Sequence, residues 1–214
     1  MIFKRVILKL NDFYKILSYM NKLLETIKIV DGKAQFLEYH NARLNYARRV
    51  LFNAQNYIDL KNIIQAPSQN GIYKSRIVYS KTIDSVEYSP YKNRDFKTFM
   101  VMVDNNIVYN FKYLDRTDLN RLVALKDGNA DDIIIIKNGF VTDISIANLA
   151  FLYNDQWITP LTPLLKGTMR ERLLRENKIV EAAIKLEDLK KFSNMAMMNA
   201  LLGFYIIDNY KLIY

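Results

Sequence analysis

The 214-residue sequence contains no cysteine, a single histidine, six glycines and four prolines. Without cysteine, the chain has no disulfide bond, thiolate metal site or cysteine nucleophile. A lone histidine, His40, argues against a multi-histidine metal site, so we expect no bound metal. The few glycines and prolines argue against long flexible linkers. These absences fit a folded protein of a reducing compartment, and we expect it in the cytoplasm.

The sequence also has no run of eighteen apolar residues, so we expect no membrane-spanning helix. Lysine and arginine number 31 against 22 acidic residues, which gives a formal net charge of +9. A basic surface attracts nucleic acid, membranes or anionic small molecules. Because the basic residues are dispersed along the chain, we interpret the charge as a solvated surface, with a pocket for an anionic substrate as the alternative. We expect neither nucleic acid nor a membrane as a partner.

The N-terminal segment, residues 1–19, has apolar residues at three- and four-residue steps, which is typical of one helix face. It lacks the continuous apolar centre and small-residue cleavage site of a signal peptide. We interpret it as an N-terminal extension, either a docking helix or a stretch that follows an upstream start codon.

The remaining sequence mixes strand and helix patterns. Asp31-Gly32 and Asn138-Gly139 are strong hairpin signals because both turn positions tolerate positive φ. We predict strands at 23–30, 34–37, 72–80, 84–89, 96–104, 133–136, 140–143, 147–153, 178–184, 195–198 and 203–207, and helices at 40–52, 116–126, 167–176 and 186–192. Many strands with separated helices indicate an α+β protein. A domain boundary is expected near residues 105–112.

Lys112 stands between the aromatic residues Phe111 and Tyr113. A lysine shielded by apolar groups loses proton affinity because its charged form is poorly solvated. Such an amine can attack a carbonyl and form a Schiff base. The alternative is an ordinary surface lysine at the end of a strand.

Three further positions could serve a phosphorylated ligand. Gly167 precedes a predicted helix, so the amides of Thr168 and Met169 would be free to bind phosphate, although a simple helix cap would look the same. Asp143 directly follows a predicted strand and could hold a protonated ring nitrogen, or act only as a turn residue. Arg43 lies on the predicted helix 40–52 and could fork onto a phosphate, or remain solvated.

Five segments, taken in order, resemble the class IV aminotransferases that depend on pyridoxal 5'-phosphate (PLP; fold type IV), and most closely the aminodeoxychorismate lyase-like proteins. LLETIKIVDGK and EYHNARL are similar to the family's opening hairpin and arginine-bearing helix, and FKYLDR to its K-x-L-N-R stretch. GFVTDISIANLAF is similar to G-x-V-T-E-x-x-x-x-N-L-F, and WITPLTPLLKGTMR to the phosphate-binding T-P…L-x-G-x-x-R segment. FSNMAMMNALLG resembles the late segment that ends in N-S or N-A. The ordered set covers residues 23–205 and is more specific than any one segment.

The resemblance implies the two-domain α+β fold of this family, which is D-amino acid aminotransferase-like, with PLP between the domains and a homodimeric assembly. A small N-terminal α+β domain would span residues 20–108, and a larger C-terminal PLP-binding domain residues 109–214. Lys112 would carry the Schiff base and move the substrate proton, and Asp143 would face the pyridine nitrogen. The phosphate would be held by Arg43, Thr168, Met169, Asn199 and Ala200.

The reaction that the resemblance favours is that of an aminodeoxychorismate lyase, which gives 4-aminobenzoate and pyruvate in folate biosynthesis. Arg116 and Met169 match the lyase version of their motifs, and the substrate would be a small anionic amino compound. The family usually has Glu at the position of Asp143 and Asn at the position of Asp115, which bears on the reaction more than on cofactor binding. One alternative is an aminotransferase for branched-chain or D-amino acids. The other is a degenerate, non-catalytic basic binding protein.

Overall fold

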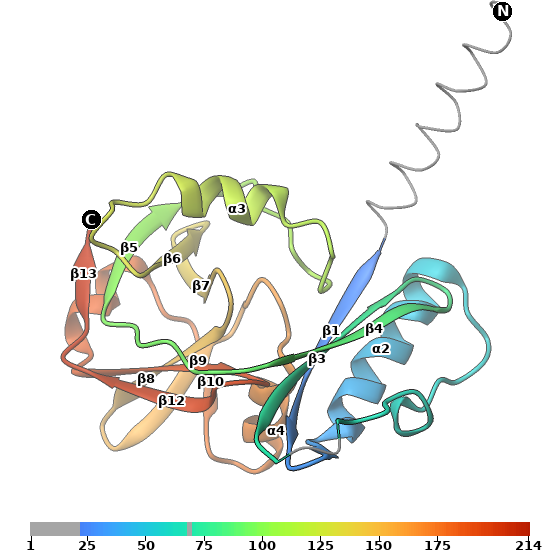
Figure 1. The fold of residues 1–214 in the computed structure, drawn as a ribbon. Helices are drawn as coiled ribbons and strands as arrows, with labels where there is room; N and C mark the ends of the chain where they lie inside the picture. The colour runs from blue at the N-terminus through green and yellow to red at the C-terminus, as the bar shows by residue number, and fades with distance from the viewer. Residues whose placement is uncertain (1–21, 68–69) are drawn as a thin grey trace, which may run out of the picture.

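The computed structural model describes residues 22–67 and 70–214, which build two β-sheets with helices packed beside them (Figure 1). The extension predicted over residues 1–19 lies outside the described residues. The smaller sheet is antiparallel in the order β2-β1-β3-β4. Its strands are β1 (Leu23–Val30), β2 (Lys33–Ala34), β3 (Ile72–Tyr79) and β4 (Ile83–Pro90).

Strand β1 has strictly alternating burial, which gives the smaller sheet two different faces. Its fully buried residues, such as Leu23 and Ile27, form a core with Leu44 of helix α2 (Leu37–Phe52). Its other residues point the opposite way, and two of them, Leu24 and Thr26, line a pocket. The alternation therefore decides which side chains of this strand reach a ligand.

The larger sheet follows the order β10-β9-β8-β7-β6-β5-β13, and β11 pairs with both β8 and β12. Its strands are β5 (Thr98–Val103), β6 (Asp132–Lys137), β7 (Phe140–Ile144), β8 (Asn148–Tyr153), β9 (Gln156–Pro160), β10 (Val180–Ala182), β11 (Asn194–Asn199), β12 (Gly203–Asp208) and β13 (Lys211–Ile213). The Ile133–Ile136 run in β6 is buried on both sides, as a continuous apolar run predicts.

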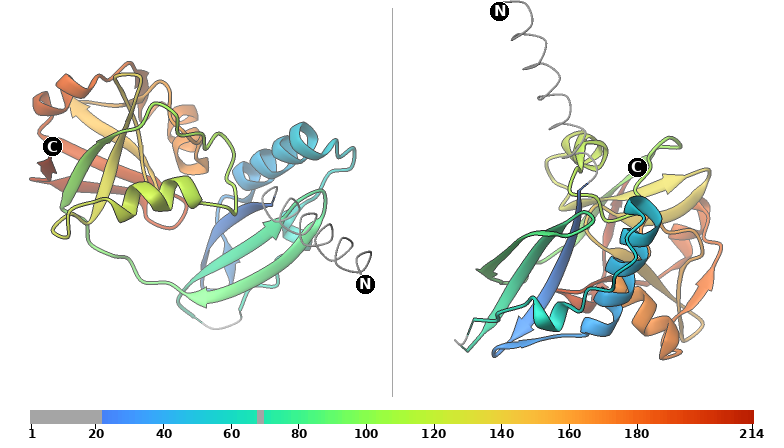
Figure 2. Two further views of the ribbon diagram at one scale, coloured as in Figure 1. Left: turned by 90° about the horizontal axis from the view of Figure 1, so that it is seen from above. Right: turned by 90° about the vertical axis from the view of Figure 1, so that its right-hand side faces the viewer.

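Two α-helices and two 3-10 turns complete the described part. Along the chain, helix α3 (Thr117–Ala124) connects β5 to β6, and α4 (Thr168–Arg175) connects β9 to β10. The 3-10 turns are η1 (Leu60–Asn62) and η2 (Leu186–Lys191). Figure 2 shows the smaller sheet and α2 at one side of the molecule and the larger sheet at the other, and helix α2 contacts α4.

The predicted α+β class is confirmed, and so are most of the predicted elements. The strand predicted over 34–37 is wrong beyond Ala34, because Phe36 takes a left-handed conformation (φ 54°) and α2 starts at Leu37. The predicted strand over 178–184 shortens to Val180–Ala182. The three-residue strand β13 has too short a pattern to predict.

The change from one sheet to the other comes before β5, because β5 pairs in parallel with β6 and β13. After β5 the chain returns to the smaller sheet, where the Leu24 N–H donates to the Lys112 carbonyl at 2.8 Å. The division into two domains itself stays a prediction. Within residues 22–67 and 70–214, no helix combines the length and apolar character needed to cross a membrane.

Candidate active site

A pocket of about 460 Å³ is lined by residues from both sheets. Six predicted site residues line it: Arg43, Lys112, Asp143, Thr168, Asn199 and Ala200. They come from α2, the segment after β5, strand β7, the start of α4, and the end of β11 with the turn that follows it. Cofactor and substrate sites are commonly concave pockets of this size, about 300–1,000 Å³.

Lys112 lies in the irregular segment that follows β5, beside strand β1. Its carbonyl accepts a hydrogen bond from the Leu24 N–H at 2.8 Å, which fixes the segment to the smaller sheet. Burial and the positive charge of Arg43, with a smaller effect of Arg116, lower the pKa of the Lys112 amine to about 8, although Glu25 opposes this. A substantial fraction of the amine is therefore neutral near physiological pH and able to act as a nucleophile.

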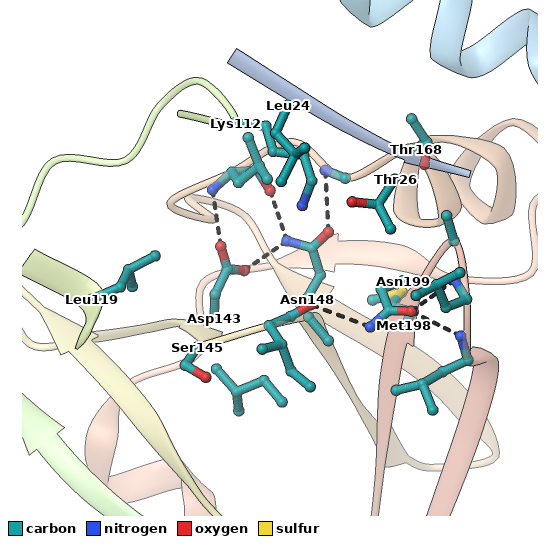
Figure 3. Close-up of a pocket in the computed structure, with 18 of the residues that line it drawn as sticks. Leu24, Thr26, Lys112, Leu119, Asp143, Ser145, Asn148, Thr168, Met198 and Asn199 are labelled. Atoms are coloured by element: carbon teal, nitrogen blue, oxygen red, sulfur yellow. Dashed lines mark hydrogen bonds between the residues drawn. The ribbon is translucent and has the colours of Figure 1, made fainter. Parts of the chain in front are cut away.

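Asp143 at the end of β7 is buried, with only 5% of its surface exposed. Its Oδ2 accepts a hydrogen bond from the Leu165 N–H at 2.9 Å, and its Oδ1 accepts one from Asn148 Nδ2 at 2.7 Å. Burial raises the pKa of Asp143 to about 7, and these hydrogen bonds oppose the rise. Figure 3 shows Asp143 and Asn148 on one side of the pocket and Lys112 and Leu24 on the other.

Arg43 is held by a buried glutamate that the sequence interpretation missed. Arg43 donates from Nε to Glu25 Oε1 at 2.8 Å and from Nη2 to Glu25 Oε2 at 2.6 Å. His40 Nδ1 lies 2.6 Å from the same Oε2. Burial disfavours the ionised form of Glu25, but Arg43 and His40 outweigh it and lower the pKa of Glu25 to about 2. Neither of these two hydrogen bonds uses the third guanidinium nitrogen, Nη1, and Arg43 lines the pocket.

The start of α4 offers unpaired amides beside the pocket. The Glu171 N–H donates to the Gly167 carbonyl at 3.0 Å as the first bond of this helix. The amides of Thr168 and Met169 therefore have no partner within the helix. Thr168 lines the pocket, whereas the side chain of Met169 is buried in the core with Leu173. A role for Met169 would thus involve its backbone, as predicted.

Asn199 stabilises the turn that follows β11 and lines the pocket. Its Oδ1 accepts hydrogen bonds from the N–H groups of Leu201 at 2.9 Å and Leu202 at 2.8 Å, and its Nδ2 donates to the Ile146 carbonyl at 3.2 Å. The amide oxygen is thus already bonded within the protein. Asn199 and Ala200 line the pocket beside the start of α4.

Four further basic side chains gather around the pocket, and we call them the basic rim: Lys74, Lys92, Arg94 and Arg116. They come from β3, the link between the sheets and the segment before α3. Their separation in the sequence hid this cluster, because dispersed charges were interpreted as a solvated surface. In three dimensions they favour the alternative, a pocket for an anionic substrate.

An amine of lowered pKa, a buried carboxyl group, Arg43 and the start of α4 share one pocket, and this combination suits a PLP-dependent enzyme. The amine suits the aldehyde of PLP, the carboxyl group its pyridine nitrogen, and Arg43 with the α4 amides its phosphate. The residues present therefore fit the cofactor.

The chain belongs to the class IV aminotransferase family of PLP-dependent enzymes, whose model matches residues 22–210. An uncharacterized protein of Haemophilus influenzae is 39% identical over 188 residues, which cover 86% of this chain and all of the relative. A crystal structure from Haemophilus somnus, provisionally assigned as a 4-amino-4-deoxychorismate lyase, is 36% identical with a TM-score of 0.80, covering 86% of this chain and 98% of that one. A PLP-bound hypothetical aminotransferase from Mycobacterium tuberculosis shares the fold, with a TM-score of 0.74 at 16% identity and coverage of 92% and 82%.

The family assignment confirms the predicted resemblance and the predicted enzyme class. It does not assign a role to any single residue, so the roles of the seven predicted site residues stay predictions.

Proposed function

We propose that this enzyme binds PLP through Lys112 and cleaves 4-amino-4-deoxychorismate to 4-aminobenzoate and pyruvate. The observation that carries the proposal is the similarity to the Haemophilus somnus structure, which spans 98% of that chain at 36% identity. The basic rim supports it, because a substrate with two carboxylates suits a pocket with clustered positive charge.

Five of the seven predicted residues then have a task that their surroundings support. Bound PLP supplies an electron sink for the substrate carbon that bears the amino group. Lys112, with its pKa near 8, holds the cofactor and then transfers the substrate proton. Asp143 holds the pyridine nitrogen, and Arg43 with the amides at the start of α4 binds the phosphate.

The reaction is tested by incubating the PLP-loaded enzyme with 4-amino-4-deoxychorismate and quantifying 4-aminobenzoate and pyruvate. Equal amounts of both products, without any added amino acceptor, are expected. Lys112→Ala should abolish the reaction, and Lys178→Ala, which changes a lysine whose side chain is 63% exposed, should not. Amino transfer to a keto acid, without pyruvate release, would instead identify an aminotransferase.

The assembly and location follow from the family as proposals. Family members generally act as dimers, and we propose a cytoplasmic homodimer here. Exposed apolar side chains on and after α2 offer a contact surface: Tyr46, Val50, Leu51 and Tyr57. Light scattering coupled to size-exclusion chromatography should give twice the 25.2 kDa chain mass, and the monomer mass would contradict the proposal.

A further inference from the structure

Asn148 links two parts of the pocket that the preceding proposal assigns to opposite ends of the cofactor. It is the first residue of β8 and lies directly across from Asp143 on β7 in the antiparallel register. The short turn between these strands is closed by the Ile144 N–H, which donates to the Ala147 carbonyl at 3.0 Å. This turn sets the amide of Asn148 beside the carboxyl group of Asp143.

The side chain of Asn148 is 95% buried, and both of its polar atoms are hydrogen-bonded. Its Nδ2 donates to Asp143 Oδ1 and to the Leu165 carbonyl, each at 2.7 Å. Its Oδ1 accepts a hydrogen bond from the Gly167 N–H at 3.1 Å. One side chain therefore contacts the buried carboxyl group and the segment that leads into α4 (Figure 3).

The segment before α4 has no strand partner of its own at Leu165 and Gly167, so its backbone depends on these side chains. Leu165 donates its N–H to Asp143 Oδ2 at 2.9 Å and offers its carbonyl to Asn148. Asp143 and Asn148 thus bind the segment from two adjacent strands. Removing either one leaves a buried backbone group without its partner, which carries a free-energy cost.

Gly167 shows how closely the backbone approaches Asn148. A Cβ atom added at Gly167 would lie 2.1 Å from Asn148 Oδ1, and the three nearest atoms beyond the neighbouring residues of the chain all belong to the Asn148 side chain. The backbone of Gly167 is extended at φ −73°, so no left-handed conformation requires glycine here. The absence of a side chain is needed because Asn148 fills that space.

We propose that Asn148 is a positioning residue that couples the carboxyl group of Asp143 to the phosphate-binding start of α4. It fixes the spacing between the group that faces the pyridine nitrogen and the amides that face the phosphate. The inference rests on the proposed binding of PLP, but not on whether the reaction is a lyase or an aminotransferase reaction.

The test is a double-mutant cycle on PLP affinity, measured by absorbance titration of the full-length protein. Asn148→Ala and Gly167→Ala should each raise the PLP Kd about tenfold, since each disturbs hydrogen bonds to a charged or buried group. In the double variant the added methyl group no longer meets Asn148. Its Kd should therefore stay close to that of Asn148→Ala, whereas independent effects would multiply to about 100-fold.

Asn194→Ala is the matched control. Asn194 and Asp208 also form a cross-strand pair in the larger sheet, with Asn194 Nδ2 donating to Asp208 Oδ1 at 2.8 Å, but they lie outside the pocket. This variant should leave the PLP Kd unchanged. Urea unfolding of each cofactor-free variant shows whether the fold is retained, so that a loss of affinity is not confused with a loss of structure.

A spectroscopic measurement separates positioning from simple support of the fold. The visible absorption maximum of bound PLP should shift in Asn148→Ala in the same direction as in Asp143→Asn, because both change the partner of the pyridine nitrogen. An Asn148→Ala protein with wild-type affinity and spectrum, or multiplicative effects in the cycle, would overturn the inference while wild-type PLP binding stands. Absence of PLP binding by the wild type would overturn this inference and the proposed function together.

Discussion

Arg43 and Glu25 form an ion pair joined by two hydrogen bonds, in which the carboxylate has no exposed surface. Glu25 belongs to β1 and Arg43 to α2. The pair therefore connects the smaller sheet with the helix that packs on the buried face of β1. His40 lies on the same carboxylate. The guanidinium group of Arg43, which lines the pocket, is thus held by a carboxylate with no exposed surface.

We therefore expect Glu25→Gln to destabilise the protein by about 3 kcal/mol, because it leaves the Arg43 charge without its buried partner. Urea unfolding of the cofactor-free protein measures this. Glu87→Gln is the control, since Glu87 forms a surface pair with Arg76 and its side chain is 61% exposed. That change should cost no more than about 0.5 kcal/mol. Equal losses for both variants would contradict the buried-pair account.

The same pair predicts a pH dependence of folding. The pKa of Glu25 is lowered to about 2 in the folded protein, from an ordinary value of 4.5. Its contribution to stability is therefore complete above pH 4.5 and is lost as the pH falls toward 2. The difference in unfolding free energy between the wild type and Glu25→Gln should shrink across this window. A difference that is constant from pH 7 to pH 2 would exclude the ionised pair.

Lys112 should react with amine reagents at a lower pH than the surface lysines. Because burial and Arg43 lower its pKa to about 8, labelling by trinitrobenzenesulfonate should rise through that pH. An ordinary lysine has its midpoint at about pH 10.4. Peptide mass spectrometry compares Lys112 with Lys178, which is mostly exposed. A midpoint for Lys112 that matches Lys178 would show that the amine is not perturbed.

Arg43→Gln tests the proposed phosphate contact through two related ligands. PLP affinity should fall by about tenfold or more, since hydrogen bonds to charged groups contribute about 1.5–3 kcal/mol. The affinity for pyridoxal, which lacks the phosphate, should change much less. Arg49→Gln changes an exposed arginine on the same helix and should leave both affinities unchanged. Equal losses for both ligands would place Arg43 away from the phosphate.

The basic rim predicts a salt-sensitive substrate affinity. Arg94→Gln should raise the KM for the doubly anionic substrate several-fold and leave the PLP Kd unchanged, because Arg94 lines the pocket but is not among the residues proposed to hold the phosphate. Lys97→Gln, at an exposed lysine outside the pocket lining, is the control. Added salt should reduce the difference between wild type and Arg94→Gln, since it screens exposed charges.

Local sequence patterns predicted much of the fold and two residues of the candidate active site, Lys112 and Asp143. The apolar run of β6, the Asn138-Gly139 turn and the helix around Arg43 all follow from the order of neighbouring residues. The resemblance of five ordered segments to the family predicted Lys112 and Asp143 as site residues, and both line one pocket in the structure. These features are short-range, so a single sequence records them directly.

The missed features depend on contacts between distant residues. Glu25 lies in the strand predicted at 23–30, where no local pattern sets it apart, and only the packing of α2 makes it the buried partner of Arg43. Asn148 needed the pairing of β7 with β8 and the approach of Gly167. The change of sheet before β5 follows from strand pairing, which local composition does not encode.

The most direct test of the account is the absorption spectrum of the purified protein and of Lys112→Ala after PLP is added. The wild type should show a visible band, distinct from that of free PLP, and this band should disappear on borohydride reduction. Peptide mass spectrometry should then find PLP covalently attached to Lys112. Lys112→Ala should show no such band. A well-folded wild type without the band, or an equal band in the variant, would contradict the assignment of Lys112 as the PLP-binding lysine.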